Sequence, residues 1–501
     1  MKINSIKWFA IVIIFLISTA GVNAQGFQSI QNNITDFKLD NGLMFIVLER
    51  HDAPVVSFFI YVDVGSANEV KGITGISHIF EHMAFKGTKT IGTTDYTTEQ
   101  KAIDREEQLY ASVLAERDKG ALADSTELRR SETEFQQAQE ASRNYVKSGQ
   151  YESIIELNGG VRLNAGTSSD ATVFYYSLPS NKTELWFSLE SDRFMNFVLR
   201  EFYQELDVIK EERRLNVENN PIGKLVEEFT AIAFKAHPYG EPIIGHMSDI
   251  THITRKQAQE YFERYYAPSN MCVAVVGDVS LSQIKEWARI YFGRIPSKPK
   301  PSSYAPVEPP QNGLRRVSVE DNSQPLLLIG YHRPGINHPD NAVCEALADI
   351  LAGGRSSRLY KSLVKEKKIA AVVQIINGFP GSKYPNLFVF FVVPTPEHTT
   401  AECETAVQAE IERIKNELVS AEELEGVKTR AKAGFIEKLR TDSGMAESLA
   451  SAYILLGDWR NVFTTVDKIN KIIPQDIQRI ATNMFVTPNM VIGEIVKIEK
   501  Q

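Results

Sequence analysis

The chain has 501 residues, of which 43% are hydrophobic and 24% charged, and its formal net charge at pH 7 is −8. This length exceeds one ordinary domain and suits two or more globular units with filled cores. The negative charge argues against nucleic acid as a partner, and three scattered cysteines, Cys272, Cys344 and Cys403, predict buried thiols rather than a disulfide framework.

The first 24 residues have the build of a cleavable secretory signal. Lys2 and Lys7 precede an apolar run from Trp8 to about Ala20, and the small-residue ending Val-Asn-Ala follows at 22–24. The residue after the expected cut is Gln25, not a lipid-accepting cysteine. We therefore expect an exported protein with no membrane span in the mature chain, periplasmic if the source is a Gram-negative bacterium.

Residues 25–295 predict a first α+β domain. The stretch DFKLDNGLMFIVLER predicts a hairpin around Asn41-Gly42, followed by a strand at VVSFFIYVDVG and a helix that contains HIFEHMAFKGT, residues 78–88. From about 98 to 151 the chain is dense in Glu, Gln, Arg, Lys and Ala, with a turn near DKGALADST. This segment predicts an inserted helical hairpin with mostly solvated faces, whose second helix is capped by Asp124 or Ser125.

A proline-rich linker at 296–313 separates this domain from residues 314–501, and the sequence partly repeats across it. A helix, a Pro-Asn turn and a strand are predicted at Ile253 to Pro268 and beyond, and again over the same interval from Ile473 to Pro488. We predict an α+β protein of two similar two-layer sandwich domains, each a mainly antiparallel sheet covered by helices. At about the positions of His78, Glu81 and His82, the second copy has Glu345, Ala348 and Asp349 instead, so we expect the predicted site in the first half alone.

The motif His78-x-x-Glu81-His82 is the strongest candidate in the sequence for a metal site. Residues four apart share one face of a helix, so the two imidazoles could bind one zinc ion, and Glu81 would lie close enough to take a proton from the water beside it. The alternative is a surface helix with a histidine pair. Ile79, Phe80, Met83 and Phe85 surround the motif with apolar side chains, and burial of unpaired imidazoles would be costly, which favours a bound partner.

A carboxylate is the natural third ligand, and the segment YQELDVIKEERRLNVENNP at 203–221 offers candidates. Glu205 and Glu212 are seven residues apart on one helix face, shared with Val208, Ile209 and Leu215. We predict Glu212 as the ligand and Glu205 as a supporting acid. A solvated acidic face remains the alternative from helix geometry alone.

With these residues in hand, the chain resembles the M16 (pitrilysin-like) metallopeptidases, specifically the two-domain bacterial members similar to the mitochondrial processing peptidase β subunit. The resemblance rests on HIFEHMAFKGT, LNAGTSSDATVFYYSLP, ELDVIKEERR, HPYGEPIIG, YYAPSNMCVAVVGDV and GGRSSRLYKSLV. It implies zinc ligands at His78, His82 and Glu212, a general base at Glu81 and a further helix acid at Glu205. It also implies that substrate binds as an added strand against Asn164-Ala165, although Asn164 by itself would suggest a turn.

The sequence departs from the family in two respects. The gap between His82 and Glu212 is longer than usual, which the insertion at 98–151 explains. Val364 and Ala371 stand where relatives carry an arginine and a tyrosine that help to hold the substrate carbonyl. We expect a zinc-dependent endopeptidase that cleaves peptides or unfolded segments, paired with a second copy or a homologous subunit. The alternative is a non-catalytic or partner-dependent assembly subunit.

Overall fold

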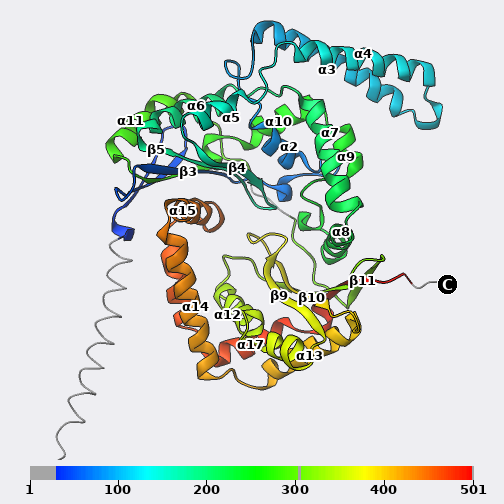
Figure 1. Ribbon diagram of the computed structural model, residues 1–501, viewed down its shortest axis with the longest axis vertical. Coiled ribbons are helices and arrows are strands. Elements are labelled where there is room, and N and C mark those ends of the chain that lie inside the picture. The colour runs from blue at the N-terminus through cyan, green and yellow to red at the C-terminus, as the bar shows by residue number, and fades with distance from the viewer. Residues whose placement is uncertain (1–29, 303–305, 499–501) are drawn as a thin grey trace, which may run out of the picture.

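Two β-sheets, one in each half of the chain, organise the computed structural model, which describes residues 30–302 and 306–498 (Figure 1). The predicted signal segment lies outside the described residues. The first sheet has the order β1-β2-β6-β3-β5-β4 and the second β7-β11-β8-β10-β9. The strands are β1 (Ile34–Lys38), β2 (Met44–Glu49), β3 (Val55–Val62), β4 (Val161–Thr167), β5 (Thr172–Pro179), β6 (Met271–Gly277), β7 (Arg315–Glu320), β8 (Leu326–Arg333), β9 (Ala370–Phe379), β10 (Asn386–Pro394) and β11 (Met490–Val496).

The two sheets share one topology, apart from the additional strand β1. Each sheet contains one parallel pair of strands, β2 with β6 in the first and β7 with β11 in the second, and its other strand pairs are antiparallel. The repeated unit is α10 (Arg255–Tyr265) followed by β6, and α17 (Pro474–Met484) followed by β11, with a 3-10 turn between helix and strand in both. The predicted α+β class and the internal repeat are therefore confirmed, and the three cysteines are free and buried as expected.

Helices cover one face of each sheet with apolar side chains. On the first sheet these are α2 (Ile76–Met83), α6 (Thr183–Met195), α10 and α11 (Leu281–Tyr291). On the second they are α12 (Asn341–Ala352), α13 (Thr400–Asn416) and α17. Within the part of the chain that the structure describes, no helix combines the length and apolar character needed to span a membrane.

The other face of each sheet is covered by a helix from the opposite half. Helix α15 (Asp442–Leu456) packs Met445, Leu449 and other apolar residues against the first sheet, and Figure 1 shows it directly below that sheet. Reciprocally, α8 (Pro221–Ala233) packs Phe229 against the second sheet. Glycine in a strand interior often marks such close approach, and a Cβ at Gly330 would lie 2.7 Å from the Phe229 ring. Each half therefore has a core of its own, and the two halves share two further apolar clusters.

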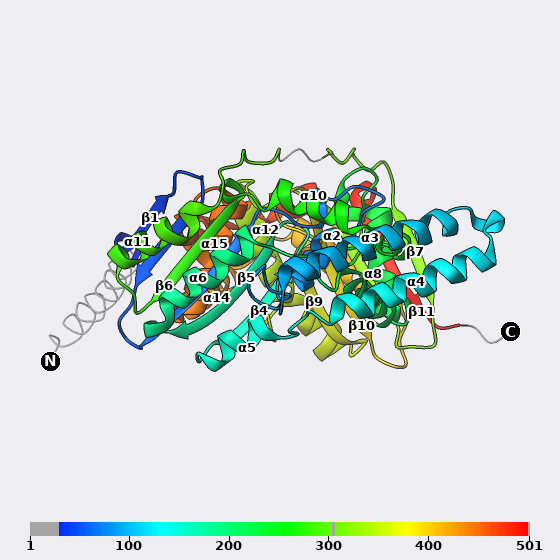
Figure 2. The ribbon, with the colours of Figure 1, turned by 90° about the horizontal axis from the view of Figure 1, so that it is seen from above.

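The insertion forms the predicted helical hairpin from α3 (Tyr96–Arg117) and α4 (Ser125–Arg143), which extends away from the body of the molecule (Figure 2). Of the two capping candidates, Asp124 accepts hydrogen bonds from the amides of Thr126 and Glu127. The expectation of mostly solvated faces is wrong at the base of the hairpin. There Glu99 and Arg200 form an ion pair with side chains 0% and 1% exposed, because the hairpin is anchored to the segment that precedes α7 (Phe202–Arg213).

Candidate metal centre

Helix α2 holds the motif residues in place through a buried carboxylate that precedes it. Glu69 accepts hydrogen bonds from the backbone amides of Gly75, at 2.7 Å, and Ser77, at 2.8 Å. These are amides of the first turn, which have no partner within the helix. Burial raises the pKa of Glu69 to about 8, although both hydrogen bonds act in the opposite direction. The start of α2, at Ile76, is thus fixed two residues before His78.

Three acceptor side chains converge between α2 and α7. His78 Nε2 lies 3.7 Å and His82 Nε2 lies 3.5 Å from Glu212 Oε2. Ligand atoms of all three residues lie within 4.8 Å of one another. Burial lowers the pKa of His78, and His82 adds to this effect, whereas Glu212 and Glu81 oppose it. The structure therefore brings together the three residues that the sequence predicted as ligands.

The spacing of these atoms fits a shared ion better than it fits hydrogen bonds. N–H···O hydrogen bonds span about 2.7–3.2 Å, which is shorter than both separations. Two ligands placed about 2.1 Å from a tetrahedral zinc ion would lie about 3.4 Å apart. Two imidazoles and one carboxylate are also the ligand set of several catalytic zinc sites, which keep one position open. The residues present therefore fit zinc in both chemistry and spacing.

Glu81 lines two cavities, which share no other lining residue. The first, of about 340 Å³, is lined by Glu81 and His82 together with charged residues that include Lys86 and Glu205. The second, of about 620 Å³, is lined by His78, Glu81 and Glu212 and extends over α8. A carboxylate in this position can contact groups that enter from either side.

The prediction that Glu205 and Glu212 lie on an apolar stripe of α7 is wrong, because two of the three apolar residues expected in that stripe are exposed. Val208 and Leu215 are 51% and 61% exposed, and only Ile209 is buried. The buried side of α7 runs instead through residues 202, 206, 209 and 213, so both glutamates lie on its flank. After Arg213 the helix widens into a π turn, Arg214–Glu218, so Leu215 no longer follows the α-helical period on which the prediction relied.

Glu205 contacts Lys86 rather than any of the three converging side chains. Lys86 Nζ lies 3.1 Å from Glu205 and 3.3 Å from Glu201. Burial would lower the pKa of Lys86, but the two carboxylates outweigh it and raise this pKa. Lys86 stands in the motif quoted above, and sequence reasoning missed it because its partners lie more than 100 residues away.

Asn164 and Ala165 lie in β4, the edge strand of the first sheet, so Asn164 is not a turn residue. The strand pairs with β5 on one side, and a register irregularity precedes Asn164. Asn164 is exposed, and its side-chain oxygen accepts a hydrogen bond from the amide of Ala165 at 2.9 Å. Gly166 and Thr167, further along the same strand, line the larger cavity beside His78 and Glu81.

The second half lacks the converging side chains at the equivalent helix, α12. Asp349 forms an ion pair with Arg430, and Glu345 accepts a hydrogen bond from Asn341 at 2.9 Å. Val364 lies in the π turn Tyr360–Glu366 and packs on the second core, while Ala371 lies near the start of β9.

Two further features of the site escaped sequence reasoning. Arg213 donates to both oxygens of Glu227, at 2.9 Å each, which ties α7 to α8 beside Glu212. Phe379, the last residue of β9 in the second half, and Pro380, which follows it, line the larger cavity. The dipeptide Pro380-Gly381 signals a turn, but nothing in a single sequence shows which site a turn approaches.

Comparisons with known proteins agree with this architecture. The family model described as Insulinase (Peptidase family M16) matches residues 45–113, and the one described as Peptidase M16 inactive domain matches residues 252–431. The zinc protease PqqE of Helicobacter pylori is 26% identical over 474 residues, which cover 93% of each chain. An uncharacterized zinc protease of Rickettsia felis is 24% identical over 92% of this chain and 98% of its own.

Solved structures show the same fold. A crystal structure of a protease from Helicobacter pylori matches with a TM-score of 0.77 and 26% identity over 92% of this chain and 99% of its own. The first half of the periplasmic protease PqqL from Escherichia coli matches with a TM-score of 0.67 at 18% identity, over 93% of this chain and 92% of its own. Family models in both halves and a shared fold along nearly the whole chain lead to one conclusion: the chain belongs to the M16 peptidase family.

Proposed function

We propose that the protein is a zinc-dependent endopeptidase that cleaves peptides or unfolded polypeptide segments. The observation that carries this proposal is the convergence of His78, His82 and Glu212 at distances that suit a shared ion, with Glu81 beside them. The relatives that are named zinc proteases support zinc as the ion. Such a set of side chains has no evident purpose in a protein that only assembles with others.

In this proposal each residue has a defined task. His78, His82 and Glu212 hold the ion, which supplies Lewis-acid activation of the scissile carbonyl when bound. Glu81 accepts the proton of the attacking water and donates it to the leaving amine, as a general base and then a general acid. Glu205 is a supporting acid that acts through Lys86, 3.1 Å away.

Substrate binding is assigned to the free edge of β4. Since β4 is the last strand of its sheet, its outward backbone groups can pair with an extended peptide. Asn164 and Ala165 would contact that peptide, and Gly166 and Thr167 would lead it to the cavity at Glu81. A chain that must lie extended along an edge has to be unfolded there, which supports peptides or unfolded segments as the proposed substrates.

Export to the periplasm is part of the proposal, supported by the composition of residues 1–24 and by a structural neighbour named as periplasmic. Pairing with a second copy or a homologous subunit is supported by Val364 and Ala371, which replace the family's substrate-holding arginine and tyrosine. The alternative is a non-catalytic or partner-dependent subunit. It is favoured by the same two residues and by the match to a model described as an inactive domain.

The decisive test measures zinc content and cleavage on the purified secreted form, alone and with candidate partners. A mixed peptide library with mass-spectrometric detection reports each cut. Glu81→Gln should keep one zinc per chain and lower the cleavage rate by about 10²–10⁴. Glu345→Gln, on the equivalent helix α12, is the matched control and should cleave as the parent does. A Glu81→Gln protein that cleaves at the parental rate, or a parent that binds no zinc, contradicts the proposal.

A further inference from the structure

We propose that a cavity of about 480 Å³ in the second half of the chain binds a small zwitterion with an apolar body, of the class of free apolar amino acids and dipeptides. This cavity, here called the second-half cavity, lies between α12, α14 (Ala421–Arg440), α15 and α16 (Asn461–Asn470). It shares no lining residue with the two cavities at Glu81. The inference is therefore independent of the proposed peptidase function.

The second-half cavity lies where the internal repeat places the counterpart of the candidate metal centre. Strand β5 is followed by α6, α7 and then α8, which covers the opposite sheet, and β10 is followed in the same order by α13, α14 and α15. Helix α14 is thus the counterpart of α7, and it lies beside α12 as α7 lies beside α2 (Figure 1). The second half therefore keeps a space between these helices, with an ion pair of Asp349 and Arg430 instead of metal-binding side chains.

The walls of the second-half cavity are built largely from apolar side chains of all four helices. They include Ala346, Val427, Ala431, Leu455, Val462 and Ile469. Small-molecule sites in proteins commonly have volumes of about 300–1,000 Å³ and apolar walls with a few polar groups. Burial of an apolar ligand here is favourable in proportion to the area removed from water.

Gly434 leaves room for a ligand in the wall that α14 forms. A glycine within a helix is destabilising by about 0.5–1 kcal/mol relative to alanine. Close approach of another segment accounts for a glycine such as Gly330, but a Cβ at Gly434 would meet no atom of another described segment within 4 Å. Packing within the protein therefore does not require this glycine, and the space that it leaves open belongs to the cavity.

Glu345 and Lys438 line the cavity with opposite charges, and neither forms an ion pair within the described residues. Glu345 accepts a hydrogen bond from Asn341 at 2.9 Å, and Lys438 is exposed. Burial raises the pKa of Glu345, although Asn341 and the charges of Arg333, Lys468 and Lys438 act in the opposite direction. The charge of Glu345 is therefore only partly compensated within the protein.

A zwitterion matches these charges better than a ligand with one charge does. Asp349 and Arg430 compensate each other, since Arg430 donates to both carboxylate oxygens. Glu345 remains for a cationic group and Lys438 for an anionic one. A ligand with a positive charge alone would also meet the repulsion of Lys438, whereas a free amino acid or dipeptide offers a partner to each.

The test uses isothermal titration calorimetry on the purified secreted form. L-Leucine and L-leucyl-L-leucine are the probes, and they distinguish an amino acid from a dipeptide as the ligand. At least one should bind, and its glycine counterpart, glycine or glycylglycine, should have a Kd at least about tenfold higher. The N-acetyl derivative of the bound probe, which lacks the ammonium group, should also bind at least about tenfold more weakly.

Two variants locate the ligand. Gly434→Phe fills the cavity from α14 and should raise the Kd of the bound probe at least about tenfold. Ala433→Phe, at the exposed neighbouring residue of the same helix, is the matched control and should keep the parental Kd. Glu345→Gln should reduce the difference between the probe and its N-acetyl derivative to less than about threefold, because the ammonium group loses its ionic partner.

Several results would overturn the inference. A parent that binds neither probe has no such site, and equal Kd values for the probe and its N-acetyl derivative exclude recognition of a zwitterion. A folded Gly434→Phe protein with the parental Kd shows that the probe binds elsewhere. The ligand series needs the parent alone, so it decides the matter even if Gly434→Phe does not fold. Each of these results leaves the peptidase function untouched, because that function is tested by cleavage.

Discussion

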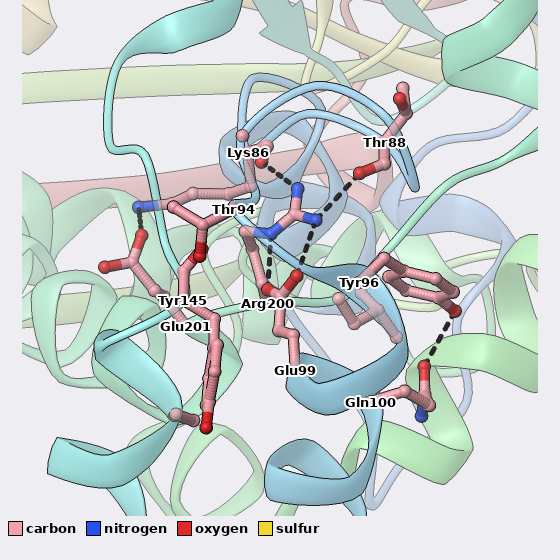
Figure 3. Close-up of polar contacts among 12 residues, drawn as sticks. Lys86, Thr88, Thr94, Tyr96, Glu99, Gln100, Tyr145, Arg200 and Glu201 are labelled. Atoms are coloured by element: carbon pink, nitrogen blue, oxygen red, sulfur yellow. Dashed lines mark hydrogen bonds and ion pairs between the residues drawn. The ribbon is translucent and has the colours of Figure 1, made fainter.

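Arg200 joins three segments around the candidate site, and its loss should be among the most damaging single changes in the protein. Its guanidinium donates to both oxygens of Glu99, at 2.7 and 3.1 Å, and to the carbonyls of Lys86 and Thr88 (Figure 3). It also donates to the carbonyl of Ile91 at 3.1 Å. These five bonds use all five N–H groups of the side chain. They fix the loop after α2, the first turn of α3 and the start of α7 to one another.

The structure sets the magnitude for Arg200→Met. Glu99 is fully buried, and a buried charge left without its partner costs about 3–5 kcal/mol. The three released carbonyls add to this cost, by up to about 1 kcal/mol each. The total of about 3–8 kcal/mol is comparable with the whole free energy of unfolding of many domains, which is about 5–15 kcal/mol. Glu99→Gln alone should cost about 3–5 kcal/mol for the same reason.

Unfolding in guanidinium chloride measures both single variants and the double variant. The double variant should lose at least about 2 kcal/mol less than the sum of the singles, because removal of both charges leaves neither one buried alone. Arg214→Met, which breaks the exposed pair with Glu211, is the control and should change stability by less than about 1 kcal/mol. Strict additivity, or a loss below about 1 kcal/mol for Arg200→Met, would refute this reasoning.

Two other variants test the centre itself. Glu212→Gln should abolish the zinc-dependent rise in Tm, which in the parent corresponds to about 2.7 kcal/mol at a zinc concentration of one hundred times Kd. Glu211→Gln, at the exposed neighbouring residue, is the control and should retain the rise. Equal thermal shifts in the two variants would exclude Glu212 as a ligand. For Glu69, burial raises the folded pKa to about 8 from its ordinary value of 4.5, so the folded state keeps a proton that the unfolded chain releases between these values. The contribution of Glu69 to stability should therefore be greatest below pH 4.5 and fall by up to about 1.4 kcal/mol per pH unit until about pH 8. Glu69→Gln should remove this slope in Tm measured from pH 5 to 8, and an unchanged slope would show that another group is responsible.

Local sequence patterns were enough to predict features that depend on residues close together in the chain, such as helix faces and the repeated helix-turn-strand unit. The i, i+4 spacing placed His78 and His82 on one face of α2, and the repeated helix-turn-strand pattern predicted both α10 with β6 and α17 with β11. Glu212 was predicted correctly as a neighbour of the histidines, but on an apolar stripe that the exposed Val208 and Leu215 do not form. The resemblance to the family, rather than helix periodicity, was the sound basis for that prediction.

Contacts between distant segments could not be predicted from periodicity. The pairing of Lys86 with Glu205 and the approach of Phe379 to the site depend on how α7 and the second sheet pack against α2. The covering of each sheet by a helix of the other half is of the same kind, since an amphipathic pattern shows that a helix packs but not which sheet it packs on.

This exchange of helices has a consequence for any attempt to divide the molecule. A fragment that ends at residue 313 would leave Phe59, Cys272 and Ala274 of the first sheet uncovered, because the residues that bury them belong to α15. The complementary fragment would lack Phe229 and expose the strands on which it rests. Neither piece should be soluble when produced alone, whereas co-expression of the two should restore a stable protein, since each supplies the shield that the other needs.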